Sequence, residues 1–541
     1  MKALTASEMR EVDRLTTERC NISSFQLMEA AGKSVCDAIL LKMSVSSPQM
    51  FPASIRICIL CGKGNNGGDG LVAARYLRLS GAEPAVLLFA APSALTGDPA
   101  ENLKRWRDTA GTLLIVDSEA AWQNNLPLVA ASHVIVDALL GTGLRGAPSG
   151  LMARAIQDVN RLSGNATSAR PALIVAVDTP SGLPSDGEAA NGALLRAHHT
   201  VTFTAPKIGQ LISRDAAACG SLQVCDIGSP RSLIDEVAKG TARWCEPREF
   251  AALPLMRAAD SNKGSYGHVL LVAGSLGKSG AAILAGRMAL RAGAGLVTVA
   301  TPAAILPVVA AGQPEFMTEG LPSTKSGTMG WKSMEKKRWQ KITSGKTVIA
   351  IGPGLGQHPQ TQKCIRQIVE KTELPIILDA DGLNAFAGNA DALRERSGKF
   401  LAVTPHPGEM ARLLACSVAE VQRDRLAIAK KAAKRWNAHV ILKGFHTIVA
   451  SPGGNAFINT TGNAGLAKGG TGDVLTGLLA ALTAQFKTDD WTKVLALGVY
   501  LHGRAAELAP EGADLSGFLA GDLTEMIARA RANLLSDLRS S

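Results

Sequence analysis

The segment with the clearest chemical content in this 541-residue sequence is NAGLAKGGTGDVLTGLLAAL, which occupies residues 463–482. Its glycines precede an apolar, helix-like stretch, and such glycines commonly bind phosphate because their amide groups can approach an anion closely. Asp473 stands where that helix would begin, and its carboxylate has two interpretations. It caps the helix, which would contribute about 0.3–1 kcal/mol, or it takes a proton from a hydroxyl group that attacks phosphorus.

Other polar residues of the C-terminal half also follow strand-like apolar runs. They are Gly354 in GPGLG, His406 in TPHPGE, and Lys443 and His446 in LKGFHT. Because the carboxyl ends of parallel strands meet at one edge of a sheet, we expect these residues to share a crevice with Asp473. The loop amides would then neutralise charge on a phosphoryl group while Asp473 acts as the base. This half is therefore predicted to transfer a phosphoryl group to a substrate hydroxyl.

The N-terminal half contains a second glycine-rich loop, GKGNNGGDG at residues 62–70, between a strand-like run and a helical segment. Its glycines would let the backbone approach a phosphate-bearing ligand such as a dinucleotide, although the spacing differs from the common dinucleotide-binding fingerprint. The side-chain oxygens of Asn65 and Asn66 suit an alkali or alkaline-earth cation. An asparagine-rich turn that binds nothing is the alternative.

Two aspartates are expected at the ends of neighbouring strands, Asp137 in VDALLGTGLRG and Asp178 in VDTPSG. Residues 141–146 would form a further phosphate-sized loop, and Ser181 ends the segment that carries Asp178. Two such carboxylates repel each other unless a cation or a proton lies nearby. The pattern therefore favours a cation or a shared proton at this edge of the sheet.

The elements that would position these residues alternate between apolar β-branched runs and helical segments, which predicts parallel α/β sheets. Helical segments at 6–20 and 24–43 precede the first strand. Strand-containing runs are expected at 55–70, 83–90, 133–144, 172–183, 199–206, 267–275, 295–302, 347–356, 374–386, 399–410 and 439–450. Because the apolar pattern weakens between about 207 and 262, we predict two α/β domains of three layers each, 1–235 and 236–541.

The composition supports a globular enzyme rich in buried parallel strands, with 46% hydrophobic but only 4% aromatic residues. No apolar run is long enough to cross a membrane and the N-terminus is not a signal peptide, so we expect a soluble, cytoplasmic protein without a membrane partner. Nine cysteines indicate reduced thiols. Cys58 and Cys61 are interpreted as buried strand residues that face opposite sides, rather than as a redox pair.

The net charge of +11 could indicate a nucleic-acid partner. However, residues 325–346 contain seven Lys or Arg and one Glu, and so supply six of those charges. We interpret this stretch as a solvated loop and expect no nucleic-acid binding.

Taken together, the motifs resemble two enzyme families. The C-terminal half resembles the NAD(P)H-hydrate dehydratases, which have a ribokinase-like fold, in the motifs NAGLAKGGTGDVLTG, GPGLG, DADGLNAF, TPHPGEM and LKGFHT. The N-terminal half resembles the NAD(P)H-hydrate epimerases, which implies a Rossmann-like domain, in the motifs GKGNNGGDGLVAARYL, VDALLGTGLRG and VDTPSGL. In this order, over nearly the whole chain, they resemble the bacterial bifunctional NAD(P)H-hydrate repair enzymes.

For the C-terminal half, the resemblance implies that ADP phosphorylates the C6 hydroxyl of (S)-NADHX or (S)-NADPHX, and that elimination restores NADH or NADPH with release of AMP and phosphate. Asp473 would be the base. The resemblance assigns the anion hole to Gly470 and Gly472, the adenine nucleotide to Lys443, Gly444, Phe445, His446 and Thr447, and the hydrate to Gly354 and His406. Magnesium would accompany the nucleotide; the side chains of Asp379, Asp381 and Asn384 could reach it, but turn and capping roles are equally open.

For the N-terminal half, the resemblance implies interconversion of the R and S hydrates. A potassium ion would be held by Asn66, Asp137 and Ser181, and Asp178 would handle the proton chemistry at C6. The nucleotide-binding residues would be Asn65, Asn66, Gly67, Gly68 and Asp69, and Gly141, Thr142, Gly143, Leu144, Arg145, Gly146 and Ala147. Lys207 either assists this chemistry or is a structural or solvated lysine, and relatives lead us to expect a homo-oligomer.

Two other functions fit parts of the pattern. A ribokinase-like kinase for a small alcohol would share the predicted C-terminal site, but it leaves the N-terminal half unexplained. A non-catalytic nucleotide sensor is less compatible with the presence of Asp473.

Overall fold

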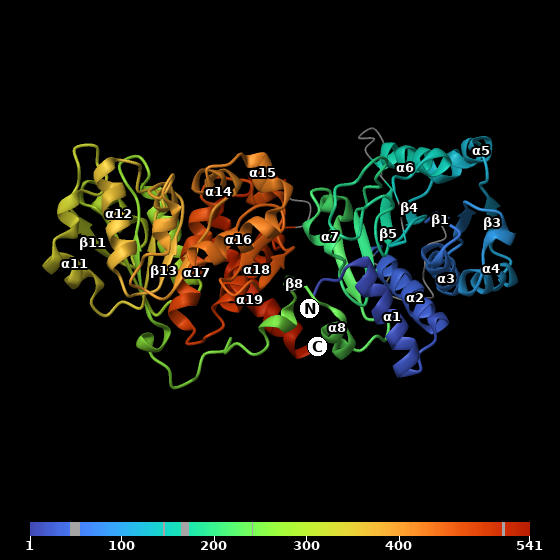
Figure 1. The fold of residues 1–541 in the computed structure, drawn as a ribbon, viewed down its shortest axis with the longest axis horizontal. Coiled ribbons are helices and arrows are strands. Elements are labelled where there is room, and N and C mark those ends of the chain that lie inside the picture. Colours follow the sequence, from blue (N-terminus) through green and yellow to red (C-terminus); the bar gives the residue numbers. More distant parts are fainter. Residues whose placement is uncertain (44–54, 144–145, 164–171, 241, 511–513, 541) are drawn as a thin grey trace. The chain divides into compact units, whose positions relative to one another are not determined.

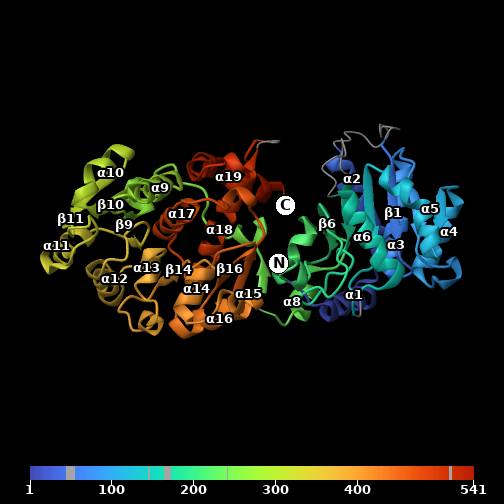
Figure 2. The ribbon, with the colours of Figure 1, turned by 90° about the horizontal axis from the view of Figure 1, so that it is seen from above.

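The computed structural model describes residues 1–43, 55–143, 146–163, 172–240, 242–510 and 514–540. The chain divides into two compact units, one of residues 2–240 and one of residues 241–541 together with Met1. In Figures 1 and 2 the first unit runs from blue to green and the second from green to red.

The N-terminal unit is built on a parallel sheet. Its strands are β1 (Ile57–Cys61), β2 (Ala85–Leu88), β3 (Thr112–Ile115), β4 (Val134–Ala138), β5 (Leu173–Val177), β6 (His199–Phe203) and β7 (Ser221–Cys225). They follow the order β3-β2-β1-β4-β5-β6-β7, and every neighbouring pair is parallel. The order reverses between β1 and β4, as in Rossmann-like sheets, and ligands bind at the carboxyl ends of the strands beside such a reversal.

The helices of this unit are α1 (Ala6–Cys20), α2 (Ser24–Lys42), α3 (Asn65–Leu79), α4 (Asp98–Asp108), α5 (Glu119–Ala130), α6 (Gly150–Ser163), α7 (Ile208–Ile212) and α8 (Arg231–Val237). The first two helices begin where the sequence predicts, at residues 6 and 24, whereas α3 begins within the glycine-rich loop at Asn65. Capping boxes start α1 and α2, at Thr5 with Glu8 and at Ser23 with Gln26. Each box satisfies backbone N–H groups that have no acceptor within the helix, which fixes the start of both helices.

Two hydrophobic clusters cover the two faces of this sheet. Side chains of α2, α3 and α4 pack on one face with Cys61, and side chains of α5 and α6 pack on the other face with Cys58. Both cysteines are fully buried. The prediction that they face opposite sides of a strand is therefore confirmed, as is the three-layer arrangement of this unit.

The C-terminal unit has a ten-stranded sheet. Its strands are β8 (Ala242–Trp244), β9 (His268–Val272), β10 (Leu296–Pro302), β11 (Met317–Leu321), β12 (Val348–Ile351), β13 (Ile376–Leu378), β14 (Leu401–Val403), β15 (His439–Leu442), β16 (Thr447–Ala450) and β17 (Ala456–Asn459). The order is β11-β10-β9-β12-β13-β14-β15-β16-β17-β8, which is parallel from β11 to β15. Here the order reverses between β9 and β12.

The prediction of a purely parallel sheet is wrong at one end of this unit, where β16 is antiparallel to both β15 and β17. The run 439–450 is two strands joined by a four-residue turn at 443–446. Such a short connection can join only antiparallel strands, because a parallel pair requires a long crossover. Positive φ values at Gly444 (138°) and His446 (54°) form the turn.

The helices of this unit are α9 (Ser279–Arg291), α10 (Leu306–Gly312), α11 (Lys336–Thr343), α12 (Pro359–Lys371), α13 (Asp381–Asn384), α14 (Pro407–Leu414), α15 (Val418–Arg423), α16 (Arg425–Trp436), α17 (Thr471–Gln485), α18 (Trp491–Glu507) and α19 (Ala520–Ser540). The basic stretch 325–346 includes α11, so its interpretation as a loop is wrong. Ile342 on α11 is buried while the lysines remain outside, which anchors the helix.

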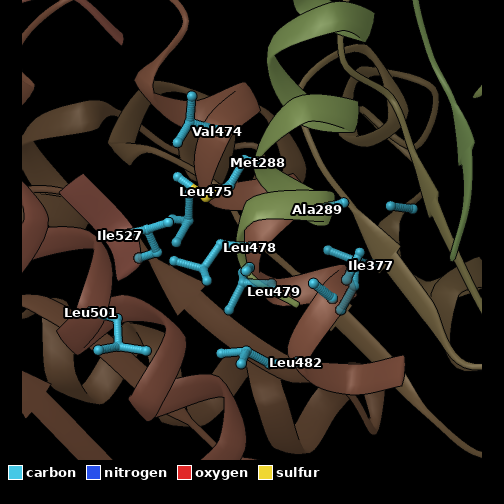
Figure 3. Packing of buried hydrophobic residues seen from close by; sticks show 14 of the residues in the cluster. Met288, Ala289, Ile377, Val474, Leu475, Leu478, Leu479, Leu482, Leu501 and Ile527 are labelled. Carbon is cyan, nitrogen blue, oxygen red and sulfur yellow. The ribbon is translucent and has the colours of Figure 1, made fainter. Parts of the chain in front are cut away.

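Two clusters again cover the two faces of the sheet. Side chains of α12, α14 and α16 lie on one face, and those of α9, α17, α18 and α19 lie on the other. Helix α17 is buried on nearly all sides, as expected for a helix that is apolar all round. Figure 3 shows Leu475, Leu478 and Leu482 of α17 among residues of this cluster, including Met288 of α9. This packing fixes the position of the α17 N-terminus, where Asp473 lies.

Within the described part of the chain, no helix is long and apolar enough to cross a membrane. The predicted α/β class and the three-layer domains are confirmed.

Candidate active sites

The candidate residues of the C-terminal unit lie around two neighbouring cavities at the carboxyl ends of its parallel strands. One cavity, of about 490 Å³, is lined by residues 443–447, by residues 459–464 and by Thr471 and Gly472. The other, of about 540 Å³, is lined by Gly277, Lys278, Gly280, Ala281, Leu284, Gly354, Ala380, Asp381, Asn384, Glu409, Gly469, Gly470 and Asp473. Both volumes fall within the range of ligand pockets.

The N-terminus of α17 contributes to both cavities. Gly470 is its N-cap, with φ 93° and no side-chain cap, and a side chain at this position would be strained. The backbone N–H groups of Gly472 and Asp473 belong to the first helical turn and have no acceptor within the helix. With the helix dipole, these groups make the border of the two cavities a position suited to an anion.

The structure does not support the interpretation of Asp473 as a helix cap. The cap position is occupied by Gly470, and Asp473 is the third residue of the helix. Among the described residues, its carboxylate has no hydrogen-bond partner. Burial, and next the Asp379 carboxylate, raise the pKa of Asp473 to about 6. A carboxylate with a pKa near the working pH is well suited to accept and release a proton.

A buried ion pair lies beside Gly472, next to Asp473 in the first turn of α17. Lys443 Nζ is 2.8 Å from Asp379 Oδ1, and Thr476 Oγ1 of α17 donates to Asp379 Oδ2 at 2.7 Å. Burial lowers the pKa of the lysine, but Asp379 and then Glu409 outweigh burial and hold the pKa above its ordinary value. Lys443 therefore stays charged at the first cavity, at the end of β15.

The capping role that the sequence left open is not seen, since α13 has no side-chain cap and distant segments hold the Asp381 carboxylate instead. Asp381 Oδ2 accepts from Gly356 N at 2.8 Å and from Lys278 Nζ at 3.3 Å, and Asn384 Nδ2 donates to Asp381 Oδ1 at 3.2 Å. Among the residues that the structure describes, no three His, Cys, Asp or Glu side chains are grouped so that they could hold a metal ion.

Most of the predicted C-terminal site residues line one of the cavities, but His406 lines neither. It is half-exposed, and its Nδ1 accepts from Gly408 N at 3.0 Å as the N-cap of α14. Two residues that were not predicted from the sequence contact backbone carbonyl groups at the first cavity. Arg425 donates to the carbonyl groups of Leu442 (3.1 Å), Lys443 (3.3 Å) and Phe445, and buried His502 Nε2 lies 3.0 Å from Thr471 O.

In the N-terminal unit, the three predicted potassium ligands come together beside the reversal point of the sheet. Ser181 Oγ donates to Asp137 Oδ1 at 2.6 Å, and Ser181 N donates to Asp137 Oδ2 at 2.8 Å. Asn66 Nδ2 donates to Leu140 O at 3.2 Å, and Leu140 N donates to Ser181 Oγ at 2.9 Å. Burial raises the pKa of Asp137 to about 6. A bound cation would favour the ionised form of this carboxylate.

Asp178 follows β5 in a strained turn, and Thr204 follows β6 in a similar one. Their φ values are 58° and 65°, and in each turn the N–H of the next residue donates to the C=O of the previous residue at 2.7 Å. Three-residue turns with positive φ are rare, and strain of this kind costs of order 1–3 kcal/mol and is concentrated at functional sites. The strain therefore marks Asp178 as a functional candidate independently of its motif.

The structure resolves the question of Lys207, which is buried rather than solvated. Its Nζ contacts Asp178 Oδ1 in an ion pair and donates to Thr202 Oγ1 at 2.8 Å. Thr202 Oγ1 in turn donates to Asp178 Oδ1 at 2.9 Å, and Gln210 Nε2 donates to Asp178 O at 2.7 Å. His199 is buried on β6, where its two ring nitrogens lie 2.7 Å from Ser221 Oγ and 3.1 Å from Gln223 Oε1.

The two predicted nucleotide-binding loops lie at the ends of β1 and β4. Asn65 to Asp69 form the first turns of α3, where a Cβ on Gly67 would come within 1.9 Å of Gly62 O. Gly141 lies against Asn66. Thr142, Gly143, Gly146 and Ala147 form the accessible part of the second loop, whereas Leu144 and Arg145 lie outside the described residues.

Asp13, an acidic residue of α1, was not predicted from the sequence. Asp13 of α1 is coupled electrostatically to Lys207 and Asp178, and burial raises its pKa to about 6. The sequence could have indicated this residue, because Asp13 lies next to Val12 in the predicted helix 6–20 and one turn from Met9 and Thr16, which are buried.

Comparisons with known proteins match a different family model to each of the two units. A family model described as NAD(P)H-hydrate dehydratase matches residues 269–529, and one described as YjeF-related protein N-terminus matches residues 24–209. The bifunctional NAD(P)H-hydrate repair enzyme Nnr of Moorella thermoacetica is 40% identical over 546 residues, covering 100% of this chain and 98% of its own. The enzyme of the same name from Escherichia coli is 35% identical over 97% of this chain and 93% of its own. A crystal structure of the ADP/ATP-dependent NAD(P)H-hydrate dehydratase from Bacillus subtilis, co-crystallised with ATP/Mg²⁺, is 32% identical with a TM-score of 0.45 and covers 54% of this chain and 98% of its own.

Proposed function

The chain belongs to the family of bifunctional NAD(P)H-hydrate repair enzymes, and from this premise we propose how its two units divide the work. The N-terminal unit interconverts the R and S hydrates of NADH and NADPH. The C-terminal unit dehydrates the S hydrate at the expense of ADP. The observation that carries the second assignment is the position of Asp473 and its helix N-terminus on the border of two cavities.

In the dehydratase, the 490 Å³ cavity takes the adenine nucleotide against residues 443–447, and the 540 Å³ cavity takes the hydrate. The C6 hydroxyl oxygen attacks the β-phosphorus of ADP, its proton passes to Asp473, and the bond between phosphorus and the AMP oxygen breaks. The N–H groups of Gly472 and Asp473 stabilise the charge that develops on the phosphoryl oxygens. Phosphate then leaves C6 and a proton leaves C5, which restores the double bond of the reduced nicotinamide.

Magnesium would enter this site with ADP. Mg²⁺ usually takes one or two carboxylates, several waters and phosphate oxygens as ligands, rather than a cage of protein groups. The absence of a metal-binding cluster of His, Cys, Asp or Glu from the described residues is compatible with that arrangement. When bound, the ion neutralises charge on the phosphates and orients them.

In the epimerase, Asn66, Asp137 and Ser181 would hold potassium. Asn66 Nδ2 and Ser181 Oγ both donate to the Leu140 carbonyl, and Ser181 Oγ also donates to Asp137 Oδ1, so the three side chains lie close together. Their amide, carboxylate and hydroxyl oxygens are the hard donors that such a cation prefers. The ion would supply positive charge for the nucleotide phosphates. Asp178, held by Lys207 and Thr202, donates a proton to the C6 hydroxyl, which leaves one face as water, and takes a proton back from the water that adds to the other face.

Product analysis tests this assignment against a small-molecule kinase. The protein is incubated with (S)-NADHX, ADP and magnesium, and absorbance at 340 nm is followed while ³¹P NMR identifies the phosphorus products. Repair gives NADH, AMP and inorganic phosphate in equal amounts. A stable phosphate ester on the hydrate, without recovery of absorbance, would instead identify a kinase.

A further inference from the structure

The cavity of about 540 Å³ to which we assign the hydrate is unevenly charged. Three acidic residues line it, Asp381, Glu409 and Asp473, and among the described residues of its lining Lys278 is the single basic one. The hydrate of a dinucleotide carries a negatively charged diphosphate bridge, which nearby carboxylates repel. Binding of a dinucleotide therefore requires positive charge at this cavity, and Lys278 is the side chain of the lining that supplies it.

The backbone of Lys278 is fixed by its neighbours, whereas its side chain is accessible. Lys278 is the last residue of the loop between β9 and α9, and its N–H donates to Ser275 O at 2.8 Å. Its carbonyl oxygen lies against Gly354, where an added Cβ would come within 2.9 Å of that oxygen. The side chain, in contrast, is 53% exposed. The ammonium group can therefore change its partner while the backbone from which it reaches the cavity stays in place.

The carboxylate that pairs with Lys278 has other partners. Lys278 Nζ lies 3.3 Å from Asp381 Oδ2, and the same oxygen accepts from Gly356 N at 2.8 Å. Asp381 Oδ1 accepts from Asn384 Nδ2 at 3.2 Å. An ion pair that involves a solvent-exposed lysine contributes little stability. Asp381 thus keeps a hydrogen bond on each oxygen when Lys278 turns toward another anion, so the exchange costs little.

Lys443, the lysine of the neighbouring cavity, is held more firmly. Its side chain is mostly buried, and its Nζ lies 2.8 Å from Asp379 Oδ1 and 3.8 Å from Glu409 Oε2. Separating a buried ammonium group from such partners is strongly unfavourable. Lys443 is therefore fixed, whereas Lys278 is free to bind a ligand.

On the basis of the proposed dehydratase function, we propose that Lys278 is a specificity-determining residue, which binds the diphosphate of the hydrate while the nicotinamide end reaches Asp473. An ammonium group on a flexible stem binds phosphate oxygens as a point charge. When the hydrate enters, Lys278 exchanges Asp381 for the diphosphate, and no covalent bond changes. The dehydratase therefore favours hydrates that carry phosphate over the hydrate of the riboside alone.

Lys278→Met tests this proposal, because it keeps a long apolar side chain and removes the charge. KM for (S)-NADHX should rise about tenfold, since a hydrogen bond between charged groups is lost, while kcat and KM for ADP change little. KM for (S)-NADPHX should rise by the same factor, because both hydrates contain the diphosphate. Hydrated reduced nicotinamide riboside has no phosphate, so its KM should be the same for Lys278→Met and the parent protein. Lys278→Arg, which keeps the charge, should restore most of the affinity.

The matched control is Lys493→Met. Lys493 Nζ also lies 3.3 Å from an aspartate, Asp490 at the start of α18, and it lines neither cavity. This variant should leave every KM unchanged.

An unchanged KM for (S)-NADHX in Lys278→Met would overturn the proposal. A fall in kcat, or an equal rise in KM for the riboside, would also overturn it, because Lys278 would then act through Asp381 or Asp473 and not on the diphosphate. A rise confined to (S)-NADPHX would place the contact at its additional phosphate and would contradict the assignment to the diphosphate. If the parent protein does not convert (S)-NADHX with ADP, the proposed function itself fails, which is a distinguishable result.

Discussion

Replacing Asp473 by asparagine should stabilise the C-terminal unit while removing its catalytic base. The folded structure raises the pKa of Asp473 from 3.8 to about 6. Since one pKa unit corresponds to about 1.4 kcal/mol, ionisation of this carboxylate destabilises the folded unit by about 3 kcal/mol at pH 8. Because the Asp473 side chain is only partly buried, solvent screening lowers this cost by about 1 kcal/mol. The neutral amide of the Asp473→Asn variant would avoid the remainder, about 2 kcal/mol.

The sign and pH window of the effect follow from the raised pKa. Below pH 3.8 the carboxyl group is protonated in both the folded and the unfolded chain, so the substitution gains nothing there. The gain grows as pH rises from about 4 to 6 and is constant above that range. At pH 5 it should be about half its value at pH 8.

Calorimetry at pH 5 and pH 8 measures this directly. For a unit of about 300 residues, 2 kcal/mol raises the unfolding temperature by about 3 °C. Asp489→Asn is the matched control, because Asp489 is exposed in the loop that follows α17 and should leave the temperature unchanged at both pH values. If Asp473→Asn lowers the unfolding temperature at pH 8, or shifts it equally at both pH values, the proposed electrostatic environment is wrong.

Three further outcomes are expected. Dehydratase kcat should fall as pH drops through about 6, because the base Asp473 becomes protonated; a profile flat to pH 5 would exclude it as the titrating base. Replacing potassium by tetramethylammonium should lower epimerase activity and leave dehydration unchanged, and an equal loss in both assays would contradict the assignment of the ion to the N-terminal unit. Arg425→Ala should raise KM for ADP by about tenfold with a smaller change in kcat, because Arg425 holds the carbonyl groups of the 443–446 turn; an unchanged KM would show that the turn does not need it.

The sequence predicts the central strands of both sheets but not their edges. Strands β3 and β7 border the first sheet, and β8 and β11 border the second. These edge strands are only partly buried. An edge strand contacts the core less than a central strand and therefore carries a weaker apolar signal. β17 is buried and was also missed, although β13 and β14, with three residues each, lie in predicted runs, so its length is not the reason.

The site residues were predictable where one loop carries the chemistry and unpredictable where distant segments meet. The neighbourhood of Asp473 follows from a single motif at a helix start. Lys207 forms an ion pair with Asp178, which lies 29 positions earlier in the chain, and this contact depends on the parallel pairing of β5 and β6. Arg425 likewise binds a turn that begins 18 residues later. No local pattern records such contacts.

The central claim is that one chain carries two independent active sites, and absorbance at 340 nm on mixed R and S NADHX with ADP and magnesium tests it most directly. The parent protein should restore absorbance fully. With Asp178→Asn, the absorbance should stop rising once the S hydrate is consumed. With Asp473→Asn it should not rise, and with a mixture of the two variants it should be restored completely. Recovery by Asp473→Asn alone, or failure of the mixture to pass the S portion, would contradict the claim.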